Sequence, residues 1–399
     1  MINDNKTALT QGKYYIGLMS GTSADGIDLA LVTFDENEKI TLHASYYQAY
    51  SHDVAEKITS LYKPCHNEID RAFALDIELA KLFSLSIKAL LSQENLSSSD
   101  IIAIGSHGQT IRHRAEIANP FTLQIGCCQT LATLTNIRVI GQFRRKDMAL
   151  GGQGAPLVPA FHQTIFRDSA DNNEPQNSSS DVFVVNIGGI SNLTFLPGSN
   201  KLNVIGYDTG PGNALIDDWF QLHTPSSQAK YDKDGKWSSS GKVSKELLKN
   251  LLSDDYFSLL PPKSTGREYF HLPWLQTQLE KSAPLSNQDV QATLTAFTAI
   301  TIVNAIEQHQ SSNIHATKVY LCGGGVHNKH LKVLINQQLE NKTTKYELLL
   351  TNQKGIDSDQ MEAMAFAWLA FAYDKKLLSS MSTVTGASKN CTLGIEFLP

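Results

Sequence analysis

The chain has 399 residues, of which 41% are hydrophobic and 18% are charged, a balance typical of globular rather than disordered proteins. The formal net charge of −5 argues against broad binding to nucleic acid or anionic membranes, because both require a basic surface. The polar start lacks a signal-peptide core, and no uninterrupted apolar run reaches membrane-spanning length. Five cysteines without CxxC spacing predict neither a disulfide framework nor a cysteine zinc site, so we expect a cytoplasmic protein.

The first predicted element is a hairpin over Tyr14–Phe34, in which two apolar runs flank a turn at Ser20–Ser23. Such a turn directs backbone N–H groups and hydroxyls at one point, which suits a phosphate. Asp25 and Asp28 would repel a bare phosphate, but they fit a phosphate that arrives with Mg²⁺, as in a nucleotide. An ordinary surface hairpin is the alternative, since its turn favours the same residue types for backbone reasons.

Helical and strand patterns then alternate along the chain. Apolar residues at helical spacing predict a helix over Ala72–Leu91. Ile101–Ile104 predicts a strand that leads into a loop, GSHGQTIRHR, and Phe121–Ile125 predicts another strand. The polar, low-complexity segment Arg167–Asp181 predicts a flexible linker.

The opening pattern recurs at Val182–Leu196, where two apolar runs flank a turn at Gly188 and Gly189, followed by Asn192. The two copies lie nearly half a chain apart. This repetition indicates two related domains, each with one phosphate-binding hairpin.

A third glycine cluster, Gly323–Gly325, follows a predicted strand at Lys318–Leu321 and precedes Asn328. Adjacent glycines allow the backbone to approach a flat ligand such as the adenosine of a nucleotide. A simple connection between strand and helix is the alternative. Neither a Walker motif nor a Rossmann GxGxxG is present.

Asp208 follows the predicted strand Leu202–Tyr207 in the segment GYDTGPGN, and Asn213 is placed to cap the next helix. A carboxylate at a strand end beside a helix N-terminus is suited to act as a general base, although an Asp that merely starts a turn is the alternative. Asp217 and Asp218, inside that helix, predict a solvated face.

Candidate substrate contacts lie in three other segments. His107, Gln109 and Thr110 fall in the predicted loop after the strand, Arg144 belongs to the cationic group FRRKD, and Glu362 is an acid on an apolar helix. Each has a structural alternative, namely loop capping, a solvated charge or a paired structural acid. The segment PPKSTGRE predicts a loop that presents cationic and hydroxyl side chains, which are Lys263, Ser264, Thr265 and Arg267.

With these residues together, the sequence resembles the anhydro-N-acetylmuramic acid kinases, a family in the superfamily of sugar kinases, Hsp70 and actin. The resemblance runs from about Tyr14 to about Gly394. It is carried, in order, by MSGTSADGID, GSHGQTIRH, FRRKD with GGQGAPLVPAFH, NIGGISN, GYDTGPGN, KSTGRE, LCGGGVHN and MEAMAFAWLA.

The resemblance implies an α/β fold of two actin-like domains with a duplicated, ribonuclease H-like core and ATP in the cleft between them. We expect the domains at residues 1–150 and 151–399, with the possibility that the C-terminal helix packs back on the first. The family also suggests a homodimer.

The resemblance places the nucleotide segment at Gly21–Asp28 and the catalytic base at Asp208. Together with the patterns above, it predicts a nucleotide site made of Gly21, Thr22, Ser23, Ala24, Asp25, Gly26, Ile27, Asp28, Gly188, Gly189, Asn192, Gly323, Gly324, Gly325 and Asn328. Asp25 and Asp28 are the expected Mg²⁺ ligands, directly or through water. The expected substrate contacts are His107, Gln109, Thr110, Arg144 and Glu362. One departure is Gln142, where the family typically has Asp before FRR.

The implied reaction converts 1,6-anhydro-N-acetylmuramic acid and ATP to N-acetylmuramate 6-phosphate and ADP, in cell-wall recycling. Asp208 deprotonates a water that attacks C1, while the bridging O6 leaves and takes the γ-phosphoryl group. Arg144 and Arg145 are candidates for the lactyl carboxylate. A kinase of the same fold acting on another sugar, or an ATP-binding protein without enzyme activity, remains the alternative.

Overall fold

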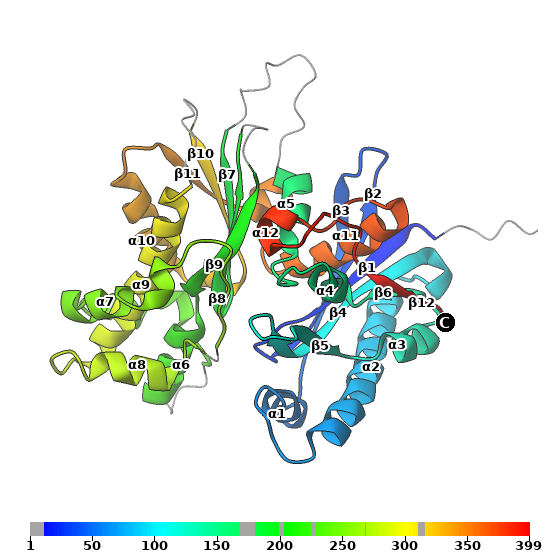
Figure 1. The fold of residues 1–399 in the computed structure, drawn as a ribbon, viewed down its shortest axis with the longest axis horizontal. Coiled ribbons are helices and arrows are strands. Elements are labelled where there is room, and N and C mark those ends of the chain that lie inside the picture. Colours follow the sequence, from blue (N-terminus) through cyan, green and yellow to red (C-terminus); the bar gives the residue numbers. More distant parts are fainter. Residues whose placement is uncertain (1–11, 167–179, 199–202, 225–228, 268, 310–315) are drawn as a thin grey trace, which may run out of the picture. The chain divides into compact units, whose positions relative to one another are not determined.

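The computed structural model describes residues 12–166, 180–198, 203–224, 229–267, 269–309 and 316–399 (Figure 1). The chain forms two compact units. Unit 1 consists of Met1–Phe161 with Gln360–Pro399, and unit 2 consists of His162–Asp359. Residues 167–179 of the predicted linker lie outside the described residues.

Unit 1 is built on a mixed sheet in the order β12-β6-β4-β1-β2-β3, with β5 paired to β4. Its strands are β1 (Tyr14–Ser20), β2 (Gly26–Phe34), β3 (Ile40–Ala49), β4 (Ile101–Arg114), β5 (Phe121–Ile125), β6 (Val139–Gly141) and β12 (Ile395–Phe397). Its helices are α1 (His52–Ser60), α2 (Glu68–Gln93), α3 (Cys128–Thr135), α4 (Phe143–Ala149), α11 (Met361–Lys375) and α12 (Ser382–Thr385). Helix α5 (Val158–Phe166) contains the boundary between the units.

Unit 2 is built on a second mixed sheet in the order β11-β10-β7-β8-β9. Its strands are β7 (Val182–Ile187), β8 (Ile190–Leu196), β9 (Ile205–Pro211), β10 (Thr317–Cys322) and β11 (Tyr346–Leu350). Its helices are α6 (Ala214–His223), α7 (Lys245–Leu252), α8 (Leu272–Leu279), α9 (Asn287–Glu307) and α10 (Lys329–Glu340).

The two sheets repeat one topology. In unit 1, β1, β2 and β3 form an antiparallel meander, β4 runs parallel beside β1, and β6 runs parallel beside β4. In unit 2, β7, β8 and β9 form the same meander, with β10 parallel beside β7 and β11 parallel beside β10. The predicted α/β fold with a duplicated, actin-like core is therefore confirmed, including both predicted hairpins.

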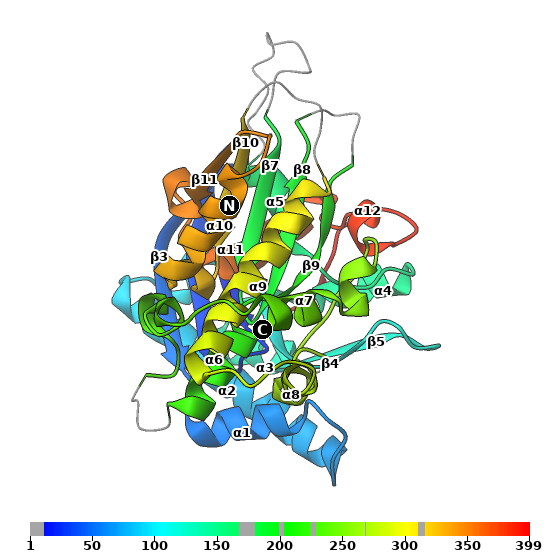
Figure 2. The same cartoon turned by 90° about the vertical axis from the view of Figure 1, so that its left-hand side faces the viewer.

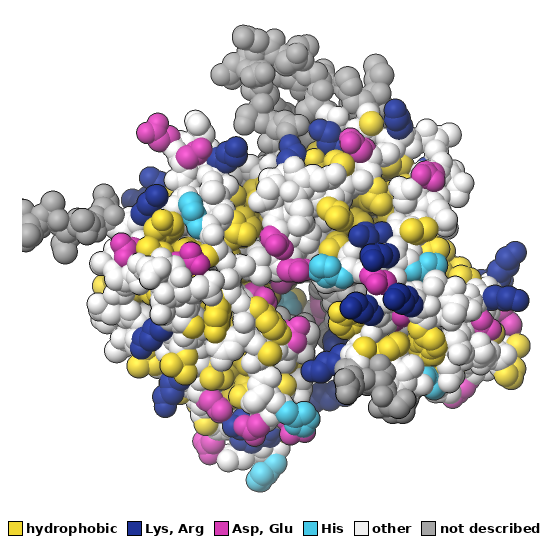
Figure 3. Space-filling model, turned by 180° about the vertical axis from the view of Figure 1, so that it is seen from behind, with side chains coloured by type: hydrophobic (Ala, Val, Ile, Leu, Met, Phe, Trp, Pro, Cys, Tyr) yellow, Lys and Arg dark blue, Asp and Glu magenta, His cyan; other side chains and the backbone are white. Residues whose placement is uncertain are grey.

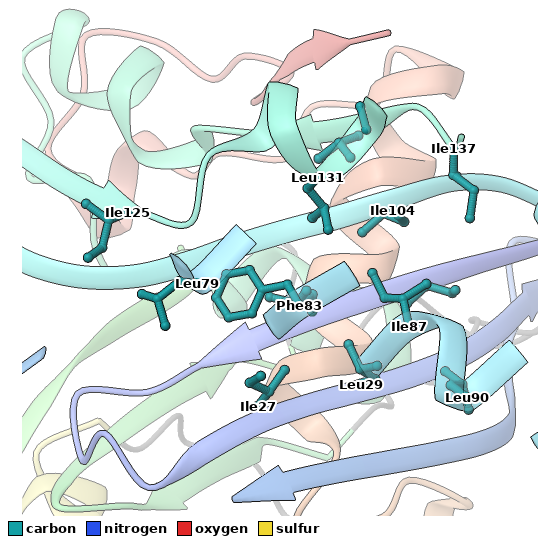
Figure 4. Close-up of a cluster of buried hydrophobic side chains, with 14 of the residues drawn as sticks. Ile27, Leu29, Leu79, Phe83, Ile87, Leu90, Ile104, Ile125, Leu131 and Ile137 are labelled. Carbon is teal, nitrogen blue, oxygen red and sulfur yellow. The ribbon is translucent and has the colours of Figure 1, made fainter. Parts of the chain in front are cut away.

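Helix α2 covers one face of the sheet of unit 1 with its apolar stripe. Phe83, Ile87 and Leu90 recur at helical spacing and pack with Ile27 and Leu29 of β2, all at 0% exposure (Figure 4). Burial of each such side chain contributes about 1.5–3 kcal/mol relative to exposure. The predicted helix is confirmed and extends further than predicted at its N-terminus.

Helix α11 packs on β1 and β4 at unusually short distance. A Cβ atom at Gly17 would lie 1.7 Å from the carbonyl oxygen of Ala363, and one at Gly105 would lie 1.9 Å from that of Phe366. Only glycine permits this approach, because any Cβ would overlap the backbone of the helix. Since successive residues of a strand alternate between faces, Gly17 faces α11 while its neighbours in β1 join the α2 cluster.

The two units differ from the predicted ranges at both ends of the second range. Residues 151–161 belong to unit 1, and so does the segment from Gln360 onward. The reason is tertiary packing, since α11 lies on β1 and β4, and β12 pairs with β6.

Helices α9 and α10 cover one face of the sheet of unit 2 (Figure 2). Among the described residues, α9 is the one helix long and apolar enough to cross a membrane by length and composition. However, 83% of its most apolar window is buried inside the unit, as in a core helix of a globular domain. On the molecular surface, Lys and Arg side chains are interspersed with Asp and Glu over the face seen in Figure 3.

The predicted loop GSHGQTIRHR is wrong, because β4 continues through it to Arg114. The first part of this segment pairs with β1 as far as Gln109, and the part from Gln109 onward pairs with β5. Most of the segment is thereby paired with a neighbouring strand, although the register shifts between Ser106 and Gln109 and again between Thr110 and Arg112. The polar side chains predicted to lie in a loop therefore sit on a paired strand.

Candidate active site

The turn between β1 and β2 is held through its carbonyl groups. The carbonyl of Gly21 accepts a hydrogen bond from Gln109 Nε2 at 3.1 Å, and that of Thr22 accepts one from Tyr62 Oη at 2.8 Å. Because the C=O and the following N–H of a trans peptide point in opposite directions, these bonds turn the next N–H groups away from the supporting side chains. This is the arrangement required of an anion-binding turn, and the exposed hydroxyls of Thr22 and Ser23 lie on it.

Gln109 lies beneath this turn rather than at an open surface. It is fully buried, its Oε1 accepts a hydrogen bond from Ser20 Oγ at 2.6 Å, and its Nε2 is bonded to the turn carbonyl. Its visible task is to hold the hairpin. A direct contact between Gln109 and substrate stays a prediction.

Asp25 and Asp28 are close enough to one side chain to act on it together. Burial raises the pKa of Tyr47, and the charges of Asp25 and Asp28 raise this pKa further. Asp25 is exposed and accepts a hydrogen bond from Ser23 Oγ at 2.9 Å, while Asp28 is half-buried on β2. Among the described residues, no group of three or more His, Cys, Asp or Glu could hold a metal ion alone. Two carboxylates fit Mg²⁺ carried by a nucleotide, which takes its other ligands from phosphate and water.

The turn between β7 and β8 is held in the same way by the start of α6. The carbonyl of Gly188 accepts a hydrogen bond from Asn213 N at 2.8 Å, and that of Gly189 accepts one from Gly212 N at 2.9 Å. A Cβ atom at Gly212 would lie 2.2 Å from the carbonyl oxygen of Gly188. The segment GPGN therefore serves as the support of the second hairpin, and the N–H of Gly189 points away from α6.

The glycines after β10 pack against the end of β7, next to this hairpin. A Cβ atom at Gly323 would lie 2.2 Å from Asn186 Oδ1, and one at Gly325 would lie 2.3 Å from Ile187 Cγ2. Gly323 also has a φ of +79°, which disfavours other residues. The structure therefore brings together two glycine clusters of unit 2 that are separated by more than a hundred residues.

Three further asparagines belong to the segments that form this part of unit 2. Asn213 is the residue before α6, but its side chain donates to the carbonyl of Ile187 at 3.5 Å and does not cap the helix as predicted. Asn328 caps α10, since its Oδ1 accepts from Leu331 N at 3.0 Å. Asn192 lies on β8 in register with Asp208 on β9. Asn192 therefore lies beside the candidate base on the neighbouring strand.

Asp208 lies inside β9, not after its end as predicted, and is held from three sides. Its Oδ2 accepts a hydrogen bond from Thr265 N at 2.9 Å, its N–H donates to the carbonyl of Lys263 at 3.2 Å, and its own carbonyl accepts from Tyr256 Oη at 2.6 Å. The register with β8 shifts next to it, leaving Thr209 as an extra residue on β9. Bulges of this kind recur beside active sites because they redirect a side chain.

Sequence patterns did not single out the hydroxyl of Tyr256 as a support of Asp208. Tyr256 follows a polar Ser-Asp-Asp segment, which gives no sign of this role. Of the residues that support Asp208, the sequence indicated only those in the hydroxyl-rich loop after Pro262. Burial raises the pKa of the Tyr256 phenol, so it remains a hydrogen-bond donor to Asp208. Burial also lowers the pKa of Lys263, whose Nζ lies 4.7 Å from the centre of the Tyr256 ring.

Arg144 and His107 form a hydrogen-bonded pair in unit 1 that holds the guanidinium in place. His107 Nδ1 donates to the carbonyl of Gly108 at 2.8 Å, so its Nε2 accepts from Arg144 Nη2 at 3.0 Å. Burial, and then the charge of Arg144, lower the pKa of His107 to about 3, which keeps the imidazole neutral. Arg144 Nη1 also donates to the carbonyl of Gly154 at 2.8 Å. The guanidinium is therefore aimed by two partners, as a carboxylate-binding group needs to be.

The remaining predicted substrate contacts, Thr110 and Glu362, and the departing residue Gln142 each have a separate local environment. Thr110 Oγ1 accepts from Gln124 Nε2 at 3.1 Å on the paired strand β5. Glu362 is half-buried in the first turn of α11, where the helix dipole favours a carboxylate. Gln142 precedes α4 with a φ of +55°, and its Oε1 accepts from Arg145 Nη1 at 3.3 Å. The departure from the family pattern therefore leaves a side chain that braces its own helix.

Asp147 is a functional candidate that sequence patterns missed, since only the cationic residues of FRRKD were singled out. It is fully buried, and burial raises its pKa. Its carboxylate accepts from Thr385 Oγ1 at 2.7 Å and from Gly154 N at 2.8 Å. Asp147 therefore fixes the glycine loop whose carbonyl aims Arg144.

Comparison with known proteins identifies the family of the chain. A family model described as anhydro-N-acetylmuramic acid kinase matches residues 13–399. An anhydro-N-acetylmuramic acid kinase of Colwellia psychrerythraea is 59% identical, with 100% of both chains covered. The chain belongs to the anhydro-N-acetylmuramic acid kinase family. The predicted family is thereby confirmed.

Other members of the family are similar over nearly their whole length. The anhydro-N-acetylmuramic acid kinase of Shewanella pealeana is 44% identical, covering 97% of this chain and 98% of its own. Among solved structures, the activator of the 2-hydroxyisocaproyl-CoA dehydratase from Clostridium difficile with bound ADPNP matches 91% of this chain and 96% of its own, at 12% identity and a TM-score of 0.42.

Asp217 and Asp218 do not form the solvated face that the sequence pattern predicted. Both are half-buried on α6, and Asp218 Oδ1 accepts from Arg267 Nη2 at 2.6 Å. Burial, and then the charge of Asp218, raise the pKa of Asp217 to about 7, against the opposing charge of Arg267. Asp217 therefore changes protonation near neutral pH.

This shift predicts a pH-dependent stability. An unfolded Asp has a pKa of about 3.9, so between about pH 4 and pH 7 the folded protein binds a proton that the unfolded chain does not. The free energy of unfolding therefore falls as pH rises through this window. We expect Asp217→Asn to be more stable than the wild type at pH 8, by about 1–3 kcal/mol, with little difference at pH 4. Urea unfolding at both pH values measures this. The exposed Asp70→Asn serves as control, and an equal effect of Asp217→Asn at both pH values contradicts the prediction.

Proposed function

We propose that this protein is an ATP-dependent kinase that opens 1,6-anhydro-N-acetylmuramic acid with water and phosphorylates O6. The products are N-acetylmuramate 6-phosphate and ADP, which returns a cell-wall sugar to amino-sugar metabolism. The observation that carries the proposal is full-length identity of 59% to a kinase named for this substrate. The support around Asp208 agrees with it, because a general base must be held in place.

In the proposed reaction, Asp208 takes a proton from a water molecule as the water oxygen attacks C1 of the sugar. The C1–O6 bond breaks, and its electron pair stays on O6. O6 then forms a bond to the γ-phosphorus of ATP, and the bond from this phosphorus to the bridging oxygen of ADP breaks. The backbone bonds to Lys263 and Tyr256 and the side-chain bond to Thr265 keep the Asp208 carboxylate in one orientation during this sequence.

The two hairpins are the proposed phosphate-binding elements, one in each unit. Both are held through turn carbonyls, which directs N–H groups outward toward an anion. Asp25 and Asp28 are suited to hold Mg²⁺, which supplies positive charge against the developing charge of phosphoryl transfer. The loop Gly323–Gly325 is the proposed adenosine contact, because its glycines permit close backbone approach.

Arg144 is the proposed partner of the lactyl carboxylate of the substrate. His107 keeps the guanidinium aimed without competing for its charge, because the imidazole is neutral. His107, Gln109, Thr110 and Glu362 complete the proposed substrate-binding set.

The reaction is tested with ATP, the anhydro sugar and ¹⁸O-labelled water. We expect ADP release that depends on the sugar, with the label at the hydroxyl on C1 and none in the phosphate. Label in the phosphate contradicts the mechanism. ADP release with another sugar but not with the anhydro sugar indicates the alternative kinase, and ATP binding without any sugar phosphorylation indicates a non-enzymatic role.

A cytoplasmic location and a homodimer remain part of the proposal. The family resemblance suggests the homodimer. Light scattering during size-exclusion chromatography measures the oligomeric state, where a mass near 44 kDa contradicts a dimer and a mass near twice that supports it.

A further inference from the structure

The loop that supports Asp208 also carries Arg267, which has no role in the reaction as described so far. Lys263 and Thr265 hold Asp208 through backbone groups, and Arg267 follows two residues later. Its side chain is 43% exposed, so it is neither buried in the core nor fully extended into solvent. The same short loop therefore controls the place of both a carboxylate and a guanidinium.

Arg267 lies against the turn of the second hairpin. A Cβ atom built at Gly189 would lie 4.0 Å from Arg267 Cδ, which is the atom directly before the guanidinium. The N–H of Gly189 points away from α6, because the preceding carbonyl of Gly188 is bonded to Asn213 N. A phosphate bound at this turn lies within reach of the guanidinium, and Arg donors match phosphate oxygens in a bidentate geometry.

The ion pair with Asp218 restrains the guanidinium of Arg267 without burying it. Asp218 Oδ1 accepts from Arg267 Nη2 at 2.6 Å, and the two side chains are 23% and 43% exposed, respectively. Partly exposed ion pairs of this kind contribute little to folding, so stability alone gives no reason for this arginine to be here. Asp217, next on α6, also lies within range of the Arg267 charge. An incoming phosphate would compete with Asp218 for the guanidinium.

We infer that Arg267 is a further catalytic residue, which contacts the transferring phosphoryl group at the second hairpin and stabilises its charge in the transition state. This inference rests on the proposed kinase function. Asp218 is then a positioning residue that holds the guanidinium beside Gly189 before ATP binds. Arginines in this role contribute strongly to kcat in other phosphoryl-transfer enzymes because they act on charge that develops only in the transition state.

The test compares Arg267→Met, Arg267→Lys and Asp218→Asn in the full-length protein, with separate kcat and KM values for ATP and sugar. We expect Arg267→Met to lower kcat by about 10³-fold, with a change of less than about threefold in the KM for the sugar. Arg267→Lys should recover only part of the loss, because a lysine cannot form the bidentate contact. ADP affinity should be nearly unchanged, whereas trapping of ADP with aluminium fluoride should be lost.

The matched control is Lys342→Met, which removes the cation of another partly exposed ion pair of unit 2, with Glu307. We expect it to retain wild-type kcat. If Arg267 served only to bridge its loop to α6, Asp218→Asn would reduce kcat as much as Arg267→Met does, and that result overturns the inference. Wild-type kcat in Arg267→Met also overturns it. Failure of the proposed function is distinct, since the wild type itself would then show no ADP release with the anhydro sugar.

Discussion

Replacing Asp208 by Asn is expected to lower kcat by about 10²–10⁴-fold, the usual loss for one well-placed general base. An amide cannot take the proton of the attacking water at neutral pH. The substitution keeps the size of the side chain, and its oxygen can still accept the hydrogen bond from Thr265 N. The bonds of the backbone to Lys263 and Tyr256 do not involve the carboxylate at all. The variant should therefore fold and bind ATP, and steady-state ADP release with the anhydro sugar measures its loss of turnover.

Asp255→Asn is the matched control, since it removes an exposed carboxylate next to Tyr256 without touching Asp208. We expect it to keep wild-type kcat. Near-normal turnover by a folded Asp208→Asn protein removes the general-base role. A Tyr256→Phe variant tests the support of Asp208 separately. It removes the hydrogen bond to the backbone carbonyl of Asp208 but keeps the carboxylate, so it should lower kcat by less than Asp208→Asn does.

Replacing Gly17 by Ala is expected to destabilise unit 1 by about 3–5 kcal/mol, a large effect for one methyl group. The added Cβ would lie 1.7 Å from the carbonyl oxygen of Ala363 and 2.7 Å from the backbone nitrogen of Ala367. Both atoms belong to the backbone of α11, which cannot move aside as a flexible side chain can. The helix has to shift away from β1, which opens the core on that face. Thermal unfolding should show a Tm lower by roughly 10 °C.

Gly21→Ala provides the stability control in the same unit. The nearest atom to a Cβ there is Ser23 Oγ at 3.6 Å, an ordinary contact, so we expect a change in Tm of no more than a few degrees. Gly105→Ala should reproduce the effect of Gly17→Ala, because its Cβ would lie 1.9 Å from the carbonyl oxygen of Phe366. Equal Tm values for Gly17→Ala and the wild type would show that α11 is not held at this distance.

Local patterns predicted the elements whose signal lies within a few neighbouring residues. The helix around Phe83 and both glycine hairpins formed as predicted, because hydrophobic spacing and turn residues act over short distances. The repeat of the hairpin at Val182–Leu196 was also visible in the sequence, and the structure extends it to a repeat of a whole five-strand topology. A repeat of strand order could not be read from the sequence, since pairing partners are distant in the chain.

Predictions failed where a long-range contact decides the environment. The segment after Ile104 contains Gly, His and Gln, residues typical of loops, yet pairing on both sides keeps it in β4. Asp217 and Asp218 follow each other in a helix and suggested exposure, but both are half-buried on α6, where Asp218 pairs with Arg267 and the charge of Arg267 also acts on Asp217. The burial of Asp147 likewise depends on Thr385, more than two hundred residues away.

The sequence by itself determined the family, the two glycine hairpins proposed to bind phosphate and the identity of the candidate base, because each depends on residue types in a fixed local order. Only the tertiary structure decided that Asp208 lies within a bulged strand and is held by Tyr256, Lys263 and Thr265. The tertiary structure also places helix α11 in unit 1, where it packs against Gly17 and Gly105 at a distance that only glycine allows. The physical reason is the same in each case. A hydrogen bond or a close backbone contact depends on atoms that the fold brings together, and no local pattern encodes their distance.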